Sequence, residues 1–154
     1  FLGLCLGMQL SLIEIARNVL NYQDANSSEF DANTTHKIID YLPNQYKGIK
    51  LGGTMRLGEY DCHILKDTLA YSLYEKEDIK ERHRHRYEFN NQYKKEFEEA
   101  GVVFSGINPQ TNLCEIIELP SNKYFIACQF HPEFQSRPLQ PHPLFKGLIK
   151  ASLD

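Results

Sequence analysis

The sequence predicts one α/β domain built around a mixed sheet. Short apolar runs typical of strands are interspersed with segments of helical periodicity, without strict alternation of the two. The 154 residues are about one domain's length, and the hydrophobic share of 42% against 24% charged residues is that of a globular protein. The net charge of −3 gives no electrostatic reason to expect a nucleic acid or an acidic membrane as partner.

The apolar pattern gives the expected elements in chain order. Strands are expected at 1–4, 36–42, 52–64, 84–89, 102–107, 114–119 and 124–130, and helices at 8–20, 68–74, 91–100 and 143–153. The polar segment 21–35 is expected to be a loop, Gly52 and Gly53 a turn, and Gly101 the end of the helix before it.

The start of the chain and its cysteines indicate its context. The chain lacks an initiator methionine and begins within an apolar run that has no signal-peptide features, so we expect a fragment of a longer protein. No apolar run approaches the roughly 20 residues that a membrane-spanning helix needs. The cysteines lack the density of a disulfide scaffold and the pairing of a metal site, which favours reduced thiols in a cytoplasmic protein.

Cys5 stands between the first apolar run and the first amphipathic segment, flanked by Gly3 and Gly7. This is the context of a nucleophile elbow, a sharp strand-to-helix turn that projects its central side chain. The start of the helix is expected to lower the thiol pKa from its free value near 8.5, and the Leu6 amide to serve as an oxyanion-hole donor. A lone cysteine is also commonly an inert buried residue, and only the strand–turn–helix context favours catalysis.

His131 follows an apolar strand near the other end of the chain and precedes Pro132 and Glu133. A histidine base needs a carboxylate on its far nitrogen, and the proline lets Glu133 fold back onto the imidazole. Alone, such a triplet is commonly an exposed loop. Together with the elbow, it completes a predicted catalytic triad of Cys5, His131 and Glu133.

Together these motifs resemble the class I (triad) glutamine amidotransferase domain, which has a flavodoxin-like α/β fold with a mixed, mainly parallel central sheet. Further segments are similar to the glutaminase domain of the CTP synthases, and the likeness covers residues 1–154 as one domain; these segments are 17–31, 52–58, 81–90 and 130–138. The resemblance implies hydrolysis of L-glutamine through a Cys5 thioester, without a cofactor or metal in this domain. It also implies that Gln9 contacts the substrate, that Glu29 binds its α-amino group, and that Arg86 binds its α-carboxylate, for which a guanidinium is the fitting partner.

The resemblance also implies parts that the sequence lacks. The N-terminal strands, with the glycine-rich loop that completes the oxyanion hole, are absent. So is the synthetase domain, which would bind ATP, Mg²⁺ and UTP and receive the ammonia. We therefore expect the fragment alone to be inactive in CTP synthesis, and the full-length protein to be a homotetramer activated by GTP. Arg56 is a candidate for that response, as a phosphate-pairing or hinge residue.

Two alternative functions are open at this point, and the Arg/His-rich run has a further interpretation. A γ-glutamyl hydrolase-like enzyme, or another class I amidotransferase, would share the elbow and the base but not the segments 52–58 and 81–90. A catalytically silent binding module on the same fold would be expected to have lost a triad residue. The Arg/His-rich run 82–86 could be a solvated face, and its residues His83 and His85 lack the acidic or cysteine partners of a metal site.

Overall fold

The computed structural model describes residues 1–41 and 55–153. Its strands are β1 (Leu2–Leu4), β2 (Asn26–Ser27), β3 (Lys37–Tyr41), β4 (Arg56–Ile64), β5 (Asp78–His85), β6 (Tyr87–Phe89), β7 (Val103–Ile107), β8 (Cys114–Glu118) and β9 (Ile126–Cys128). Its helices are α1 (Leu6–Asn18), α2 (Leu69–Tyr74), α3 (Lys94–Glu99) and α4 (Pro143–Leu153), with short 3₁₀ turns η1 (Asn91–Tyr93) and η2 (Pro132–Phe134). The α/β class is therefore confirmed.

The central sheet has six strands in the order β1-β9-β8-β7-β4-β5. It is mixed, as predicted, but only β1 and β9 are parallel among its described pairs; the other four pairs are antiparallel. The expected predominance of parallel pairs is thus not found in these residues. The reason is local, because β7, β8 and β9 follow one another through short connections, and short connections join antiparallel strands. A smaller sheet, β2-β3-β6, lies beside α1.

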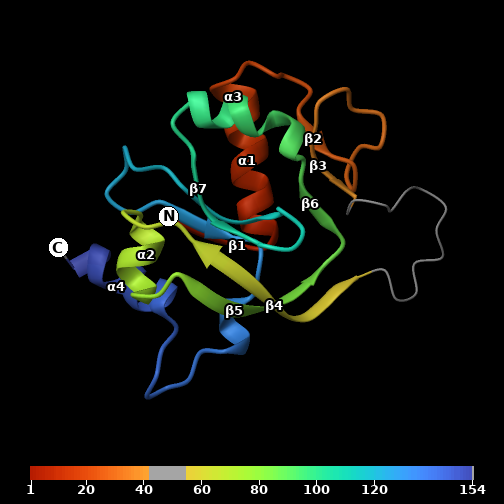
Figure 1. Cartoon of the computed structure of the whole chain (residues 1–154). Helices are drawn as coiled ribbons and strands as arrows, with labels where there is room; N and C mark the ends of the chain where they lie inside the picture. Colours follow the sequence, from red (N-terminus) through yellow and green to blue (C-terminus); the bar gives the residue numbers. More distant parts are fainter. Residues whose placement is uncertain (42–54, 154) are drawn as a thin grey trace.

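Helices cover both faces of the central sheet (Figure 1). Met8 and Leu12 of α1, with Phe97 of α3, pack on one face, while α2 and α4 pack against each other on the opposite face. Successive residues of β9 alternate between the two cores: Ala127 faces α1, and Ile126 and Cys128 face the other side. This alternation produces a strand that is apolar at every position and buried on both faces.

Several expected boundaries shift in the structure. The strand expected at 84–89 is two strands in different sheets, because the chain leaves the central sheet after His85 and enters the small sheet at Tyr87. The expected helix before Gly101 begins as a 3₁₀ turn, and Gly101 ends it with a φ of 91°. The expected turn at Gly52 and Gly53 lies outside the described residues.

Cys62, Cys114 and Cys128 are free cysteines buried in the core. None of the helices that the structure describes combines the length and the apolar character needed to cross a bilayer.

Candidate active site

Cys5 occupies a sharp turn between β1 and α1. Its φ of 47° and ψ of −102° are strained for a residue with a side chain, at a cost of about 1–3 kcal/mol. The Cys5 amide donates a 2.8 Å hydrogen bond to the carbonyl of Cys128, which ties the turn to β9. A Cβ on Gly3 would lie 2.9 Å from that of Ala127, so this glycine is sterically required, whereas a Cβ on Gly7 would meet open space. The predicted elbow is present, but the steric reason holds for Gly3 alone.

The Cys5 thiol does not have the lowered pKa that the start of a helix predicts. Burial raises the pKa of Cys5 to about 11, and the negative charges of Glu88 and Glu133 act in the same direction. Hydrogen bonds from the Leu6 amide and the Gln129 side chain lower the pKa, so the expected effect exists but is smaller than that of burial. In this state the thiol is protonated at neutral pH, and its activation requires a base.

His131 is held in one orientation from three sides. Its Nδ1 lies 2.6 Å from Oε1 of Glu133, which η2 brings back toward the ring, and its backbone amide donates to the carbonyl of Arg82. Phe134 stacks on the imidazole with ring centroids 5.1 Å apart. A carboxylate only accepts, so Nδ1 carries the proton and Nε2 holds a free lone pair. Nε2 is buried, and no residue of the described ranges hydrogen-bonds to it.

The sheet brings the thiol and the imidazole to the same edge. β1 and β9 are parallel neighbours, with Leu4 opposite Cys128, so both strands end together. Cys5 follows the end of β1, and His131 lies three residues beyond the end of β9. The carboxyl ends of adjacent parallel strands are where open α/β sheets build their sites.

The three residues expected to contact a substrate lie around Tyr87. Gln9 is 3% exposed, and its Nε2 donates to the carbonyl of Tyr87 at 3.0 Å. Glu29 and Arg86 both act electrostatically on the pKa of Tyr87, which burial raises to about 12. Glu29 is exposed, whereas Arg86 is half-buried and its Nε has no hydrogen-bond partner among the described residues. The Arg86 guanidinium can therefore still donate a hydrogen bond to an anionic partner.

Arg56 is not available to a phosphate, so its expected phosphate-pairing role is wrong. Its side chain is buried, with Nη1 3.1 Å from Glu88 and Nη2 2.5 Å from Glu115. The guanidinium also lies over the ring of Tyr60, 4.5 Å from the ring centroid. Both terminal nitrogens of the guanidinium are thus paired with buried carboxylates, and this residue does not fit a nucleotide phosphate.

The Arg/His-rich run is a half-buried strand and not a solvated face. Along β5, Glu81, His83 and His85 are buried, while Arg82 and Arg84 point to solvent. Nδ1 of His83 lies 2.8 Å from Nε2 of His85, so the two rings bind each other. No set of three or more side chains suited to hold a metal ion occurs in residues 1–41 and 55–153.

This buried network predicts a maximum in stability near pH 6.5. Burial lowers the pKa of His83 to about 2 and of His85 to about 3, so the folded state excludes their protons and stability falls as the pH drops below 6.5. Burial also raises the pKa of Glu88 to about 8, so stability falls as the pH rises from 4.5 through 8. The Glu115 pKa, raised to about 6, acts in the same direction, so the opposing slopes offset each other between pH 4.5 and 6, and stability falls above pH 6.5.

The Glu88→Gln variant tests this balance. It should remove the alkaline loss that Glu88 causes, at most about 1.4 kcal/mol per pH unit for one proton. Melting temperatures of the wild type and the variant at pH 5.5, 7 and 8.5 measure the effect. Parallel curves for the two proteins would contradict the raised Glu88 pKa.

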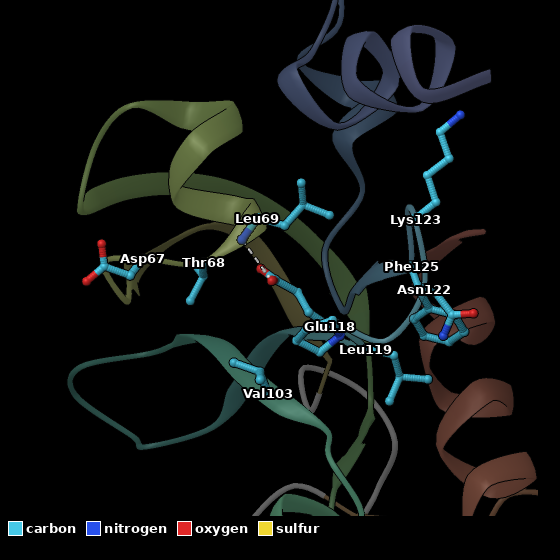
Figure 2. A pocket seen from close by; sticks show the side chains of 10 residues that line it. Asp67, Thr68, Leu69, Val103, Glu118, Leu119, Asn122, Lys123 and Phe125 are labelled. Atoms are coloured by element: carbon cyan, nitrogen blue, oxygen red, sulfur yellow. Dashed lines mark hydrogen bonds between the residues drawn. The ribbon is translucent and has the colours of Figure 1, made fainter. Parts of the chain in front are cut away.

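A separate pocket of about 260 Å³ contains none of the predicted site residues (Figure 2). Its buried acid, Glu118, accepts hydrogen bonds from the backbone amides of Leu69 and Ala70 and thereby caps α2. Both carboxylate oxygens accept these bonds, so the burial of Glu118 has a structural reason and does not indicate a ligand site. Sequence reasoning did not identify Glu118, because a cap from a distant strand leaves no local pattern.

Comparisons with known proteins agree with this geometry. The family model described as "Glutamine amidotransferase class-I" matches residues 1–151. CTP synthase of Staphylococcus saprophyticus is 57% identical over 154 residues, and that of Aquifex aeolicus is 57% identical over 152 residues. These matches cover 100% and 99% of this chain but 29% of each relative, so the chain spans under a third of their length.

A solved structure of a glutaminase domain is also similar to this chain. The Trypanosoma brucei CTPS glutaminase domain with bound acivicin superposes with a TM-score of 0.91 at 36% identity, covering 99% of this chain and 60% of that one. The family match extends over nearly the whole sequence, from the elbow through the His131–Glu133 pair to α4. The chain therefore belongs to the class I glutamine amidotransferase family.

Proposed function

We propose that this chain is the glutaminase part of a CTP synthase, which hydrolyses L-glutamine and supplies ammonia for the ATP-dependent amination of UTP to CTP. The observation that carries the proposal is the pairing of the strained Cys5 elbow with the His131–Glu133 pair at the ends of two adjacent parallel strands. Identity to CTP synthases along the whole chain supports this role over that of a γ-glutamyl hydrolase-like enzyme or a silent module.

The reaction begins when the Cys5 sulfur attacks the side-chain amide carbon of glutamine. His131 Nε2 takes the thiol proton and passes it to the leaving ammonia, which leaves a γ-glutamyl thioester. The same nitrogen then activates water, which releases glutamate and restores the thiol. The Leu6 amide, which already bonds to the thiol, would stabilise the oxyanion formed in each step.

The substrate's α-amino and α-carboxylate groups would bind Glu29 and Arg86. Arg86 suits the carboxylate because its Nε is buried without a partner in the described part of the chain. Gln9 would contact the substrate through its side-chain oxygen, because its amide nitrogen is already occupied by Tyr87 and Gln129.

The remaining parts of the proposal concern the whole protein. We place residues 1–154 in one glutamine amidotransferase domain whose ammonia is used by a synthetase domain of the same polypeptide. ATP and Mg²⁺ would bind that synthetase domain, GTP would activate the enzyme at a site other than Arg56, and the enzyme would act as a cytoplasmic homotetramer. β1 lies at an edge of the described sheet, where further strands of such a domain could pair.

Formation of CTP tests the proposal. The full-length gene product, given UTP, ATP and Mg²⁺, should form CTP with either glutamine or ammonium chloride as nitrogen source. Chromatography of the nucleotides measures the product. Failure to form CTP even with ammonium chloride would count against the synthase role, whereas failure with glutamine alone would count against the glutaminase site.

Glu133→Gln should lower the kcat of glutamine hydrolysis by on the order of 10²–10⁴-fold, with a smaller change in KM. The amide cannot stabilise the imidazolium and can favour the wrong tautomer of His131. Steady-state measurement of ammonia release gives both constants. Glu77→Gln is a suitable control, since its carboxylate pairs with Lys66 at the surface. Equal rates for Glu133→Gln and the wild type would exclude Glu133 as the orienting carboxylate.

A further inference from the structure

We propose that Gln129 is an additional catalytic residue, whose side-chain amide donates a hydrogen bond to the attacking sulfur of Cys5 and directs it toward the substrate. Gln129 lies between the end of β9 and His131 and is fully buried. Its Nε2 lies 3.6 Å from the Cys5 sulfur, within the range of a hydrogen bond to sulfur. The inference deepens the proposed function, on which its kinetic part rests.

The orientation of the Gln129 amide follows from a chain of partners. The carbonyl of Tyr87 can only accept, so Gln9 must turn its NH₂ group toward it. The same nitrogen lies 3.1 Å from the Gln129 side chain, which must therefore present its oxygen to Gln9. The Gln129 NH₂ group is then left to face the thiol. The donor role is thus fixed by a backbone carbonyl and does not depend on an arbitrary choice between amide nitrogen and oxygen.

The backbone of Gln129 is fixed by hydrogen bonds, and it holds the side-chain amide in place. The backbone N–H of Gln129 donates to the carbonyl of Glu115 on β8 at 2.9 Å. The preceding residue, Cys128, accepts from the Cys5 amide, so the elbow and Gln129 are attached to the same stretch of chain. A donor held this rigidly can fix the direction of the sulfur without a large loss of entropy on each turnover.

The surroundings of the Cys5 sulfur disfavour the thiolate, and the Gln129 side-chain donor opposes this effect. Burial and the negative charges of Glu88 and Glu133 all disfavour the thiolate. Hydrogen bonds from the Leu6 amide and from Gln129 are the interactions that oppose them. The Leu6 amide is also the proposed oxyanion donor, so it must turn its hydrogen bond to the substrate oxygen as the tetrahedral intermediate forms. Gln129 is not needed as an oxyanion donor, so its side chain can keep its hydrogen bond to the sulfur throughout the reaction.

Two variants separate the donor role from a purely structural one. Gln129→Met removes the amide at similar volume. Gln129→Glu keeps an acceptor for Gln9 but takes away the N–H group that faces the sulfur. The matched controls are Gln135→Met and Gln135→Glu, because Gln135 lies in the same segment and its amide donates only to the carbonyl of Lys80 among the described residues.

The first measurement is the rate of Cys5 alkylation by iodoacetamide in the full-length gene product, followed by mass spectrometry of the Cys5 peptide from pH 6 to 10. Both Gln129 variants should react about 10-fold more slowly at pH 8, with the pH midpoint shifted upward, since a hydrogen bond to an ionised group is lost. The Gln135 variants should stay within about twofold of the wild type. Wild-type alkylation in Gln129→Glu would overturn the inference, because that variant preserves the bond to Gln9.

The second measurement is glutamine hydrolysis. We expect kcat to fall about 10–100-fold in both Gln129 variants, with KM changed less than about threefold. A fall in alkylation without any glutaminase activity in the wild type would refute the proposed function and leave the thiol contact standing. Normal hydrolysis and normal alkylation in Gln129→Glu would refute the inference alone. Circular dichroism checks folding, and the isosteric Glu variant serves if the Met variant does not fold.

Discussion

Cys5→Ala in the full-length gene product should reduce glutamine-dependent ammonia release by on the order of 10⁴-fold or more. The methyl group cannot attack the amide carbon, and the covalent route through the thioester is then closed. The loss is expected to equal or exceed that from Glu133→Gln, because the orienting carboxylate affects only the state of His131. A coupled assay with glutamate dehydrogenase measures the ammonia directly.

Activity with ammonium chloride should survive the same substitution. Ammonia added to the solution does not need the thioester, so CTP formation from UTP would continue at near the wild-type rate. Cys62→Ala is the matched control, since it removes a buried thiol from β4 outside the site and should keep glutaminase activity within about twofold. Unchanged ammonia release in Cys5→Ala would refute the assignment of the nucleophile. An equal loss of ammonia release in Cys62→Ala would show that the effect is not specific to Cys5.

The elbow was predictable from sequence because its determinants are local. Gly3 precedes the cysteine where a Cβ would collide with Ala127, and helical periodicity begins just after the turn. The position of His131 at a strand end was equally local. Their closeness, by contrast, depends on the parallel pairing of β1 with β9, two strands separated by more than a hundred residues. From the sequence they could be paired only on chemical grounds, as a nucleophile and the base it needs, and the resemblance to a family supported that pairing.

The thiol pKa and the role of Arg56 were not predictable in this way. A helix start indicates a lowered thiol pKa, but the amount of burial at Cys5 is set by distant segments and outweighs it. Arg56 follows a glycine-rich segment, as a phosphate-binding arginine can, yet β4 places it between two carboxylates from β6 and β8. The sequence did contain one signal of the buried network. Glu81, His83 and His85 alternate with arginines at the period of a strand, which indicates a strand with one buried polar face.

Arg56→Met should lower the free energy of unfolding by about 3–5 kcal/mol. Removing the guanidinium leaves Glu88 and Glu115 buried together without their counter-charge, and breaking a buried ion pair on one side costs this much. The loss should be largest at alkaline pH, where both carboxyl groups are ionised, and smallest near pH 5, where Glu88 is protonated. Hydrogen exchange of the β4 and β5 amides measures the local stability even if the full-length protein unfolds in several steps.

The exposed residue Arg84 supplies the control, since it lies on β5 opposite Leu57 and has the same charge. Arg84→Met should change stability by no more than about 0.5 kcal/mol. At alkaline pH, adding Glu88→Gln to Arg56→Met should recover part of the loss, because one of the two unpaired buried charges is then removed. If Arg56→Met behaves like Arg84→Met, the ion pairs of Arg56 with Glu88 and Glu115 do not stabilise the fold. If instead the recovery occurs, the charge of Arg56 is needed by the carboxylates and is not available to an external phosphate.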